Sequence, residues 1–210
     1  MIDYLKDPAE IYRRSWRLVR EATELERVPA DLADIALRLV HATAMPDLVD
    51  LLAGSSGASA AGRAALGRGA PVLVDTEMVS LGIIRARLPA ANSVLCTLND
   101  PAVAQRATAS GATRAAVAVD LWGARLDGAV VAIGNAPTAL FRLLELVAAG
   151  APRPALVLGF CVGFVGSAEA KEALAASGLP HIVLNGRRGG SAMAAAAVNA
   201  LAGPPEGDTP

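Results

Sequence analysis

The sequence is poor in aromatic residues, cysteine and histidine. Phe, Trp and Tyr make up only 3% of the 210 residues, so a stacking platform for single-stranded nucleic acid is not expected. The two cysteines, Cys96 and Cys161, lie in separate apolar runs, a pattern that fits neither a disulfide framework nor a zinc site. We expect both to be buried, reduced thiols in a cytoplasmic protein.

The sequence also lacks a charge excess and a long apolar run. Its 19 basic and 20 acidic residues give a formal charge of -1, so it has no basic field that would attract nucleic acid. The first ten residues carry charges where a signal peptide needs an apolar core. No apolar stretch reaches the roughly 18 to 20 residues that span a bilayer. We therefore expect neither a signal peptide nor a membrane span.

Small aliphatic residues are abundant. Hydrophobic residues make up 53% of the chain and charged residues 19%, a composition typical of a folded globular protein and not of a disordered one. The length fits one domain, which we place at residues 1–202. The last residues, 203–210, are rich in Pro and Gly and are expected to form a disordered tail.

The first third of the sequence has helical patterns. Asp7 precedes a proline and is followed three residues later by Glu10, an arrangement close to a capping box, which predicts a helix to about Leu25. A second helix is predicted over residues 29–43 from apolar side chains at helical spacing. Residues 46–68 are expected to form an interrupted helix.

From residue 71 onward the pattern changes to short apolar runs separated by helical stretches. The runs predict six strands buried on both faces, at 71–75, 93–97, 115–120, 129–133, 155–160 and 181–184. The helical stretches lie at 76–84, 100–110, 137–149, 167–176 and 190–201. Because parallel strands need crossover connections, this alternation predicts an α/β protein with a parallel sheet between two helical layers, a three-layer α/β/α architecture.

Ligands of such sheets bind beyond the carboxyl ends of the strands, where this sequence has several polar segments. They are residues 75–77, 97–100, 134–138, 159–166 and 185–191. Asn135 precedes Pro137 at an expected helix start, where free backbone amides attract carboxylate or phosphate groups. Helix capping alone also explains these residues, and none of the segments matches a dinucleotide fingerprint or a P-loop.

Asp34, Arg38 and His41 fall on one face of the second predicted helix, at positions i, i+4 and i+7. One interpretation is a solvated face with an ion pair between Asp34 and Arg38. The other is a proton donor, His41, beside an anion-binding Arg38 whose guanidinium is oriented by Asp34. The second histidine, His181, opens a buried strand, and we expect it to be structural.

Ser15 is expected on the inward face of the first helix with Ile11, Leu18 and Val19. The simplest interpretation of its hydroxyl is a hydrogen bond to the carbonyl of Ile11. The sequence has no G-x-S-x-G elbow, no cysteine near a histidine and no cluster with metal-ligand spacing. A hydrolase or a metalloenzyme is therefore unsupported.

Six segments resemble those of the precorrin-8X methylmutase family and occur in the family's order between residue 3 and about residue 202. The segments are Ile11-Tyr12-Arg13-Arg14-Ser15, Arg38-Leu39-Val40-His41-Ala42, Asp75-Thr76-Glu77-Met78-Val79, Gly134-Asn135-Ala136-Pro137-Thr138-Ala139-Leu140, Val162-Gly163-Phe164-Val165-Gly166 and Gly189-Gly190-Ser191-Ala192-Met193.

This resemblance implies an isomerase of cobalamin biosynthesis that moves a methyl group from C-11 to C-12 of the macrocycle to give hydrogenobyrinate, without a cofactor. His41 matches the family's catalytic histidine, and Ser15 and Arg38 match substrate-contacting positions. The family fold is flavodoxin-like with five parallel strands, and its members are homodimers. One of the six predicted strands is then surplus, and 93–97 and 181–184 are the candidates.

The implied substrate is a broad apolar ring edged with carboxylates, which requires apolar walls, small residues and hydrogen-bond donors. The predicted substrate contacts are Ser15, Arg38, Asp75, Thr76, Asn135, Thr138, Arg187, Gly190 and Ser191. Two other functions remain open: a non-catalytic tetrapyrrole carrier, and a phosphate or nucleotide binder that uses the glycine-rich turns. The sequence leaves open whether the ring contains cobalt.

Overall fold

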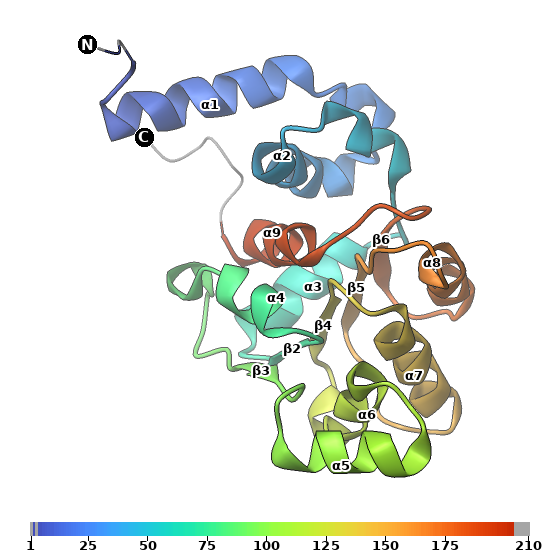
Figure 1. Cartoon of the computed structure of the whole chain (residues 1–210). Coiled ribbons are helices and arrows are strands. Elements are labelled where there is room, and N and C mark those ends of the chain that lie inside the picture. The colour runs from blue at the N-terminus through green and yellow to red at the C-terminus, as the bar shows by residue number, and fades with distance from the viewer. Residues whose placement is uncertain (1, 3, 204–210) are drawn as a thin grey trace.

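A six-stranded sheet forms the centre of the structure, a computed structural model that describes residues 2 and 4–203 (Figure 1). Its order is β1-β6-β5-β4-β2-β3. All neighbours are parallel except β1, which pairs antiparallel with β6 at one edge. The strands are β1 (Leu52–Gly54), β2 (Val72–Val74), β3 (Val94–Cys96), β4 (Val130–Ile133), β5 (Leu156–Gly159) and β6 (His181–Leu184).

Helices cover both faces of the sheet (Figure 1). One face packs against α3 (Ala58–Gly67), α4 (Glu77–Gly82) and α9 (Ser191–Ala202). The other packs against α6 (Arg114–Asp120), α7 (Pro137–Ala148) and α8 (Ser167–Ala176), and α5 (Pro101–Ser110) lies outside α6. Alternate residues of β4 enter the two cores, Val130 and Ala132 on one side and Val131 and Ile133 on the other. The predicted three-layer α/β/α architecture is confirmed.

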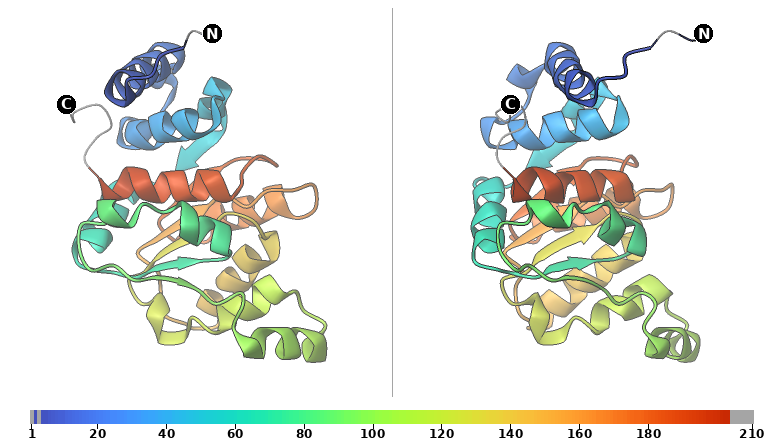
Figure 2. Two further views of the ribbon diagram at one scale, coloured as in Figure 1. Left: turned by 60° about the vertical axis from the view of Figure 1, so that its left-hand side comes forward. Right: turned by 90° about the vertical axis from the view of Figure 1, so that its left-hand side faces the viewer.

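Two further helices lie beyond α9, on the side away from the sheet (Figure 2). Helix α2 (Ala33–Thr43) packs along α9, and α1 (Pro8–Ala22) packs on α2. Asp7 caps α1 by accepting a hydrogen bond from the backbone amide of Ala9 at 3.0 Å, which confirms the predicted helix start. The chain thus adds two helical layers to one face of the sheet.

Helix α9 is buried on nearly all sides because it lies between the sheet and α2. Its run of alanines allows this close packing. Its neighbours contribute glycines where they approach most closely: a Cβ atom added to Gly82 would lie 2.7 Å from that of Ala195, and one added to Gly134 would lie 2.9 Å from that of Ala194. The alanine-rich composition therefore has a structural cause.

The structure corrects two predictions of secondary structure. Residues 115–120 belong to helix α6 and do not form a strand, because the Thr113 side chain accepts the Ala116 amide at 3.2 Å and starts a helix there. Residues 52–54, expected within an interrupted helix, form the edge strand β1. The runs at 93–97 and 181–184 both contain strands, so the surplus prediction was 115–120.

The N-terminal helix differs from its predicted packing. It ends at Ala22 and buries only Trp16, whereas Ile11 and Leu18 are 45% and 51% exposed. The expected inward face of this helix was therefore wrong at both positions. Among the described residues, no helix combines the length and apolar character needed to cross a membrane. Apart from Gly203, the predicted tail at 203–210 lies outside the described residues.

Candidate active site

His41 lies where α1 crosses α2 and contacts two consecutive residues of α1. The Ser15 hydroxyl oxygen is 3.3 Å from Nδ1 of His41. The Trp16 indole lies parallel to the imidazole, with ring centroids 4.4 Å apart and an interplanar angle of 7°. Ser15 thus bonds to the histidine instead of to the Ile11 carbonyl as expected. The imidazole is fixed both at its edge and on its face.

Arg38 lies near the same cluster, with its guanidinium carbon 5.8 Å from the centroid of the Trp16 ring. The ion pair of Asp34 is with Arg63 on α3, at 2.8 Å. Arg63 also donates to the backbone oxygens of Leu201 and Gly203 at the end of α9. The ion pair that the structure shows for Asp34 therefore joins α2 to α3 and, through Arg63, to the end of α9.

Met45, four residues after His41 in the sequence, lines a groove of about 540 Å³. The Arg187 guanidinium carbon is 5.5 Å from the centroid of the Phe164 ring, which is 85% exposed. Arg188 forms an ion pair with Asp47 and thereby lowers the pKa of that carboxyl group. The groove combines apolar surface with two guanidinium groups. It is lined by Met45, Asp47, Val162, Gly163, Phe164, Arg187, Arg188, Gly189 and Met193.

Two loops line this groove, one with residues 162–164 and the other with residues 187–189, and hydrogen bonds hold them in place. The side chain of Lys171 is buried and donates to the carbonyl oxygens of Leu184 and Arg188, both at 2.7 Å, and burial lowers its pKa. The Gly190 amide donates to the carbonyl of Phe160 at 2.8 Å, which joins the loops directly. The residue before it must also be glycine, because a Cβ on Gly189 would lie 2.2 Å from the Phe160 oxygen.

Asp75 is buried and bonds to the chain itself. Its carboxylate accepts the backbone amides of Gly134, Asn135 and Ala136 at 2.8 to 2.9 Å. Burial raises the pKa of Asp75, and the three amide bonds, which favour the charged form, oppose that shift. The backbone amides expected to bind a substrate anion are therefore occupied by Asp75, which gives this carboxylate a structural role, while substrate contact by Asp75 stays a prediction.

Thr76 and Ser191 are also buried, with their hydroxyl oxygens 3.2 Å apart. Thr76 additionally accepts the Val79 amide at 3.3 Å and so caps α4. This pair ties the end of β2 to the start of α9. Gly134 packs closely against the start of α9, because an added Cβ would be 2.8 Å from the Cα of Ser191.

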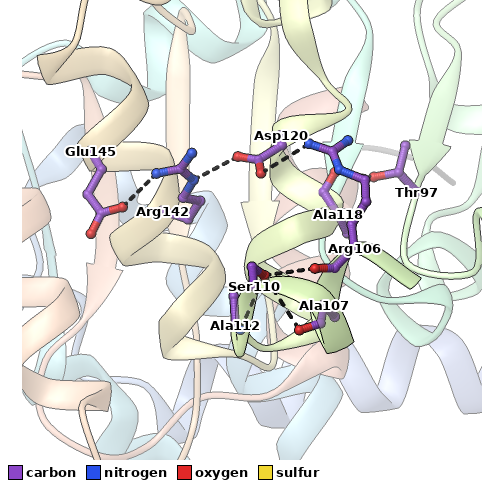
Figure 3. Close-up of polar contacts among 9 residues, drawn as sticks. All are labelled: Thr97, Arg106, Ala107, Ser110, Ala112, Ala118, Asp120, Arg142 and Glu145. Atoms are coloured by element: carbon purple, nitrogen blue, oxygen red, sulfur yellow. Dashed lines mark hydrogen bonds and ion pairs between the residues drawn. The ribbon is translucent and has the colours of Figure 1, made fainter. Parts of the chain in front are cut away.

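Asn135 and Thr138 are exposed but face different surroundings. The carbonyl of Asn135 accepts the Val162 amide at 3.3 Å, so Asn135 borders the Phe164 loop. Thr138 bonds to Thr113 at 2.8 Å and lines a separate groove of about 560 Å³ between α6 and α7. Figure 3 shows the ion pairs beside that groove, which run from Arg106 through Asp120 and Arg142 to Glu145. These charges neutralise one another.

His181 and Cys161 are buried as expected, whereas Cys96, also expected to be buried, is half-buried. His181 is buried with Nδ1 2.8 Å from the Leu179 carbonyl, as expected for a structural histidine. Both cysteines are free thiols, and burial raises the pKa of Cys161 and brings that of Cys96 to about 11. Within the described part of the chain, no group of three or more His, Cys, Asp or Glu side chains is placed to hold a metal ion.

The sequence analysis missed Trp16, Phe164 as an exposed side chain, and Lys171. Trp16 could have been found from the scarcity of aromatics, since one of only two tryptophans directly follows the candidate Ser15. Lys171 gave no signal, because a lysine in a predicted surface helix is ordinarily exposed.

Comparison with known proteins places these features in one family. Residues 10–203 match the family CbiC, precorrin-8X methylmutase. The chain is 59% identical to the precorrin-8X methylmutase of Pseudomonas aeruginosa, over 96% of this chain and 98% of that one. It is 36% identical to the cobalt-precorrin-8 methylmutase of Methanothermobacter thermautotrophicus, over 91% of each chain. The solved structure of precorrin-8X methylmutase from Thermus thermophilus has a TM-score of 0.85 and 41% identity, over 92% of this chain and 94% of that one.

Proposed function

The chain belongs to the precorrin-8X methylmutase family, whose members are isomerases of cobalamin biosynthesis, and we propose that His41 is the proton donor of its reaction. The reaction we assign moves a methyl group from C-11 to C-12 of the precorrin-8X macrocycle to give hydrogenobyrinate. The contact between His41 and Ser15, at 3.3 Å, is the observation that carries this proposal. It fixes one nitrogen of the imidazole and so defines which nitrogen transfers the proton.

The proton moves from His41 to the macrocycle and later returns. In the protonated imidazole, Nδ1–H donates to the Ser15 oxygen, and the transferable proton is on Nε2. Protonation draws electron density out of the ring system and lowers the barrier to methyl migration. The methyl group never leaves the molecule, and His41 regains its proton as the product forms, so the isomerisation needs no net donor or acceptor.

Basic residues bind the carboxylates at the edge of the macrocycle. Arg38, next to the Trp16 ring, provides a planar donor close to His41. The groove with Arg187 and Phe164 offers apolar surface for the ring together with a second guanidinium. Asn135, at the border of the Phe164 loop, remains a proposed contact. Gly190 serves by its lack of a side chain, which leaves room for the ring.

We propose the metal-free macrocycle as the natural substrate, because identity to the named precorrin-8X methylmutases exceeds identity to the cobalt-precorrin-8 enzymes. We further propose that the enzyme works in the cytoplasm as a homodimer. The apolar side chains Ile11 and Leu18 on α1 support the dimer, since about half of each stays exposed to solvent in the single chain.

The test is the steady-state turnover of precorrin-8X by His41→Asn, with Arg38→Ala beside it. We expect His41→Asn to lower kcat about 10²- to 10⁴-fold, the usual contribution of a general acid. Arg38→Ala should raise KM more than it lowers kcat, because it removes a binding contact. Wild-type turnover by His41→Asn would contradict the proposal. If the wild-type protein binds precorrin-8X but does not convert it, a tetrapyrrole carrier would be favoured.

A further inference from the structure

Trp16 is the one side chain of α1 that the structure buries, and it lies directly on His41. Its exposed fraction is 2%, and its indole is parallel to the imidazole at 4.4 Å. Tyr12, one turn earlier on α1, packs its ring edgewise against Trp16 at 6.1 Å and 66°. The indole is thus supported by its own helix on one side and presents a face to His41 on the other.

We propose that Trp16 is a positioning residue that sets the plane of the His41 imidazole, an inference that rests on the proposed role of His41. Ser15 and Trp16 restrain different motions of that ring. The Ser15 hydroxyl, 3.3 Å from Nδ1, limits rotation within the ring plane, and the stacked indole limits tilting out of it. Because both residues are on α1 and His41 is on α2, the packing of α1 on α2 sets the orientation in which the imidazole donates its proton.

The charges around the indole suit this role. The face of an indole attracts cations, and Arg38 has its guanidinium carbon 5.8 Å from the ring centroid. A protonated imidazole stacked on the same indole is attracted in the same way. Trp16 therefore accommodates two cations close together, the proton-carrying His41 and the carboxylate-binding Arg38. An aliphatic side chain at this position would fill the space beside His41 and Arg38 but would not attract either cation.

The second tryptophan provides a matched control. Trp122 is also fully buried, but it lies in the core on the opposite face of the sheet. Among the described residues, the buried Nε1 atoms of both tryptophans have no hydrogen-bond partner. Replacement of Trp16 by Phe therefore removes no hydrogen bond of the described residues and keeps an aromatic face, whereas Leu removes that face. Trp122→Leu deletes the same volume far from His41.

The first experiment compares kcat and KM of these variants with precorrin-8X. We expect Trp16→Leu to lower kcat by about 10- to 100-fold with little change in KM, since a misplacement of about 1 Å costs on that order. Trp16→Phe should restore most of kcat, and Trp122→Leu should leave kcat of the folded enzyme unchanged. Equal kcat for Trp16→Leu and the wild type, or an equal loss in Trp122→Leu, would overturn the proposal.

A double variant separates this inference from the proposed function. If Trp16 acts through His41, Trp16→Leu should lower the residual rate of His41→Asn little further. The same fold-loss in both backgrounds would overturn the positioning role. Wild-type turnover by His41→Asn would instead overturn the proposed function itself. The two failures therefore give different results.

A spectroscopic readout tests the stacking without turnover. The C–H protons of an imidazole above an indole resonate upfield, and with only two histidines in the chain His41→Asn assigns them. We expect this upfield shift in the wild type and in Trp16→Phe, and its loss in Trp16→Leu. Trp16→Met carries the same comparison where the Leu variant does not fold. An unchanged shift in the folded non-aromatic variant would overturn the proposal.

Discussion

At the scale of single residues, the three amides at the start of α7 meet the one carboxylate of Asp75. Both oxygens of this buried carboxylate accept hydrogen bonds from these backbone amides, with N···O distances of 2.8 to 2.9 Å. A buried donor left without its acceptor costs about 1 to 3 kcal/mol. Asp75 therefore stabilises the turn between β4 and α7, in which the Asn135 carbonyl accepts the amide of Val162, a residue of the groove.

Replacement of Asp75 by Asn tests this structural role. Asn offers one acceptor oxygen, and its amide group would face the remaining backbone N–H groups, so we expect the free energy of unfolding to fall by about 2 to 4 kcal/mol. Urea denaturation measures this change. The control is Asp100→Asn, since Asp100 caps α5 and Asn caps equally well. Unchanged stability with a raised KM would show that Asp75 contacts substrate.

Lys171 tests how far the groove depends on its supporting network. Lys171→Met removes the two hydrogen bonds to the loop that carries Arg187 and Arg188. Each bond is worth roughly 1 kcal/mol, so KM should rise about fivefold or more while kcat changes less. A fall in kcat alone would contradict this account of the loop.

The same variant has a defined pH dependence. Burial lowers the pKa of Lys171 below its ordinary value of 10.5, so the unfolded chain binds this proton more tightly than the folded one. The free energy of unfolding of the wild type, minus that of Lys171→Met, should therefore rise as pH increases from the lowered folded pKa toward 10.5. Urea denaturation of both proteins across that window measures it. A difference that shrinks with rising pH would contradict the direction of the shift.

At the scale of elements, α2 holds His41 in place because it is fixed to α9. Packing supplies most of the contact, and Arg63 adds a polar link from α3 to Asp34 on α2 and to the carbonyls of Leu201 and Gly203. The ion-pair side chains are 31% and 30% exposed, so solvent weakens their attraction. The link aligns the helices more than it drives folding.

Arg63→Ala should lower the free energy of unfolding by about 1 to 2 kcal/mol, a value reduced for solvent screening. A double-mutant cycle with Asp34→Ala separates the ion pair from the bonds to α9. The matched control is Arg17→Ala, which removes an exposed pair with Glu21 and should change nothing measurable. Full additivity of Arg63→Ala and Asp34→Ala would show that the pair contributes no stability.

The elements also show what sequence patterns can and cannot predict. Most helices and five of the six strands followed from apolar periodicity and capping residues. Residues 115–120 did not, because a short buried apolar run fits a helix or a strand equally, and only Thr113 as a cap favoured the helix. Strand β1 has three residues, too few to show a period.

The same limit applies to the site. Helical spacing correctly placed Arg38 and His41 near one another, but the partner of Asp34 is 29 residues away on α3. Asp75 and the Asn135 amide were both correctly located at the carboxyl ends of strands, yet they bind each other. Local patterns place a side chain on an element, whereas its partner depends on tertiary packing.

At the scale of the whole molecule, α1 stands outside the layered body and buries one side chain against it (Figure 2). Its outward Ile11 and Leu18 are the surface that our dimer proposal uses. Sedimentation should give about twice the chain mass of 21.3 kDa. Leu18→Glu should shift the protein toward monomer, whereas Leu81→Glu, at an exposed apolar position on α4, should not. A wild-type monomer at assay concentration would contradict the dimer.

The proposed function requires this protein to isomerise precorrin-8X with His41 as the acid. The most direct measurement mixes stoichiometric precorrin-8X with the wild type and with His41→Asn and follows the visible spectrum over a single turnover. We expect the wild type to give the hydrogenobyrinate spectrum, and His41→Asn to bind the substrate and keep the spectrum of bound precorrin-8X. Formation of product by His41→Asn at the wild-type rate would contradict it.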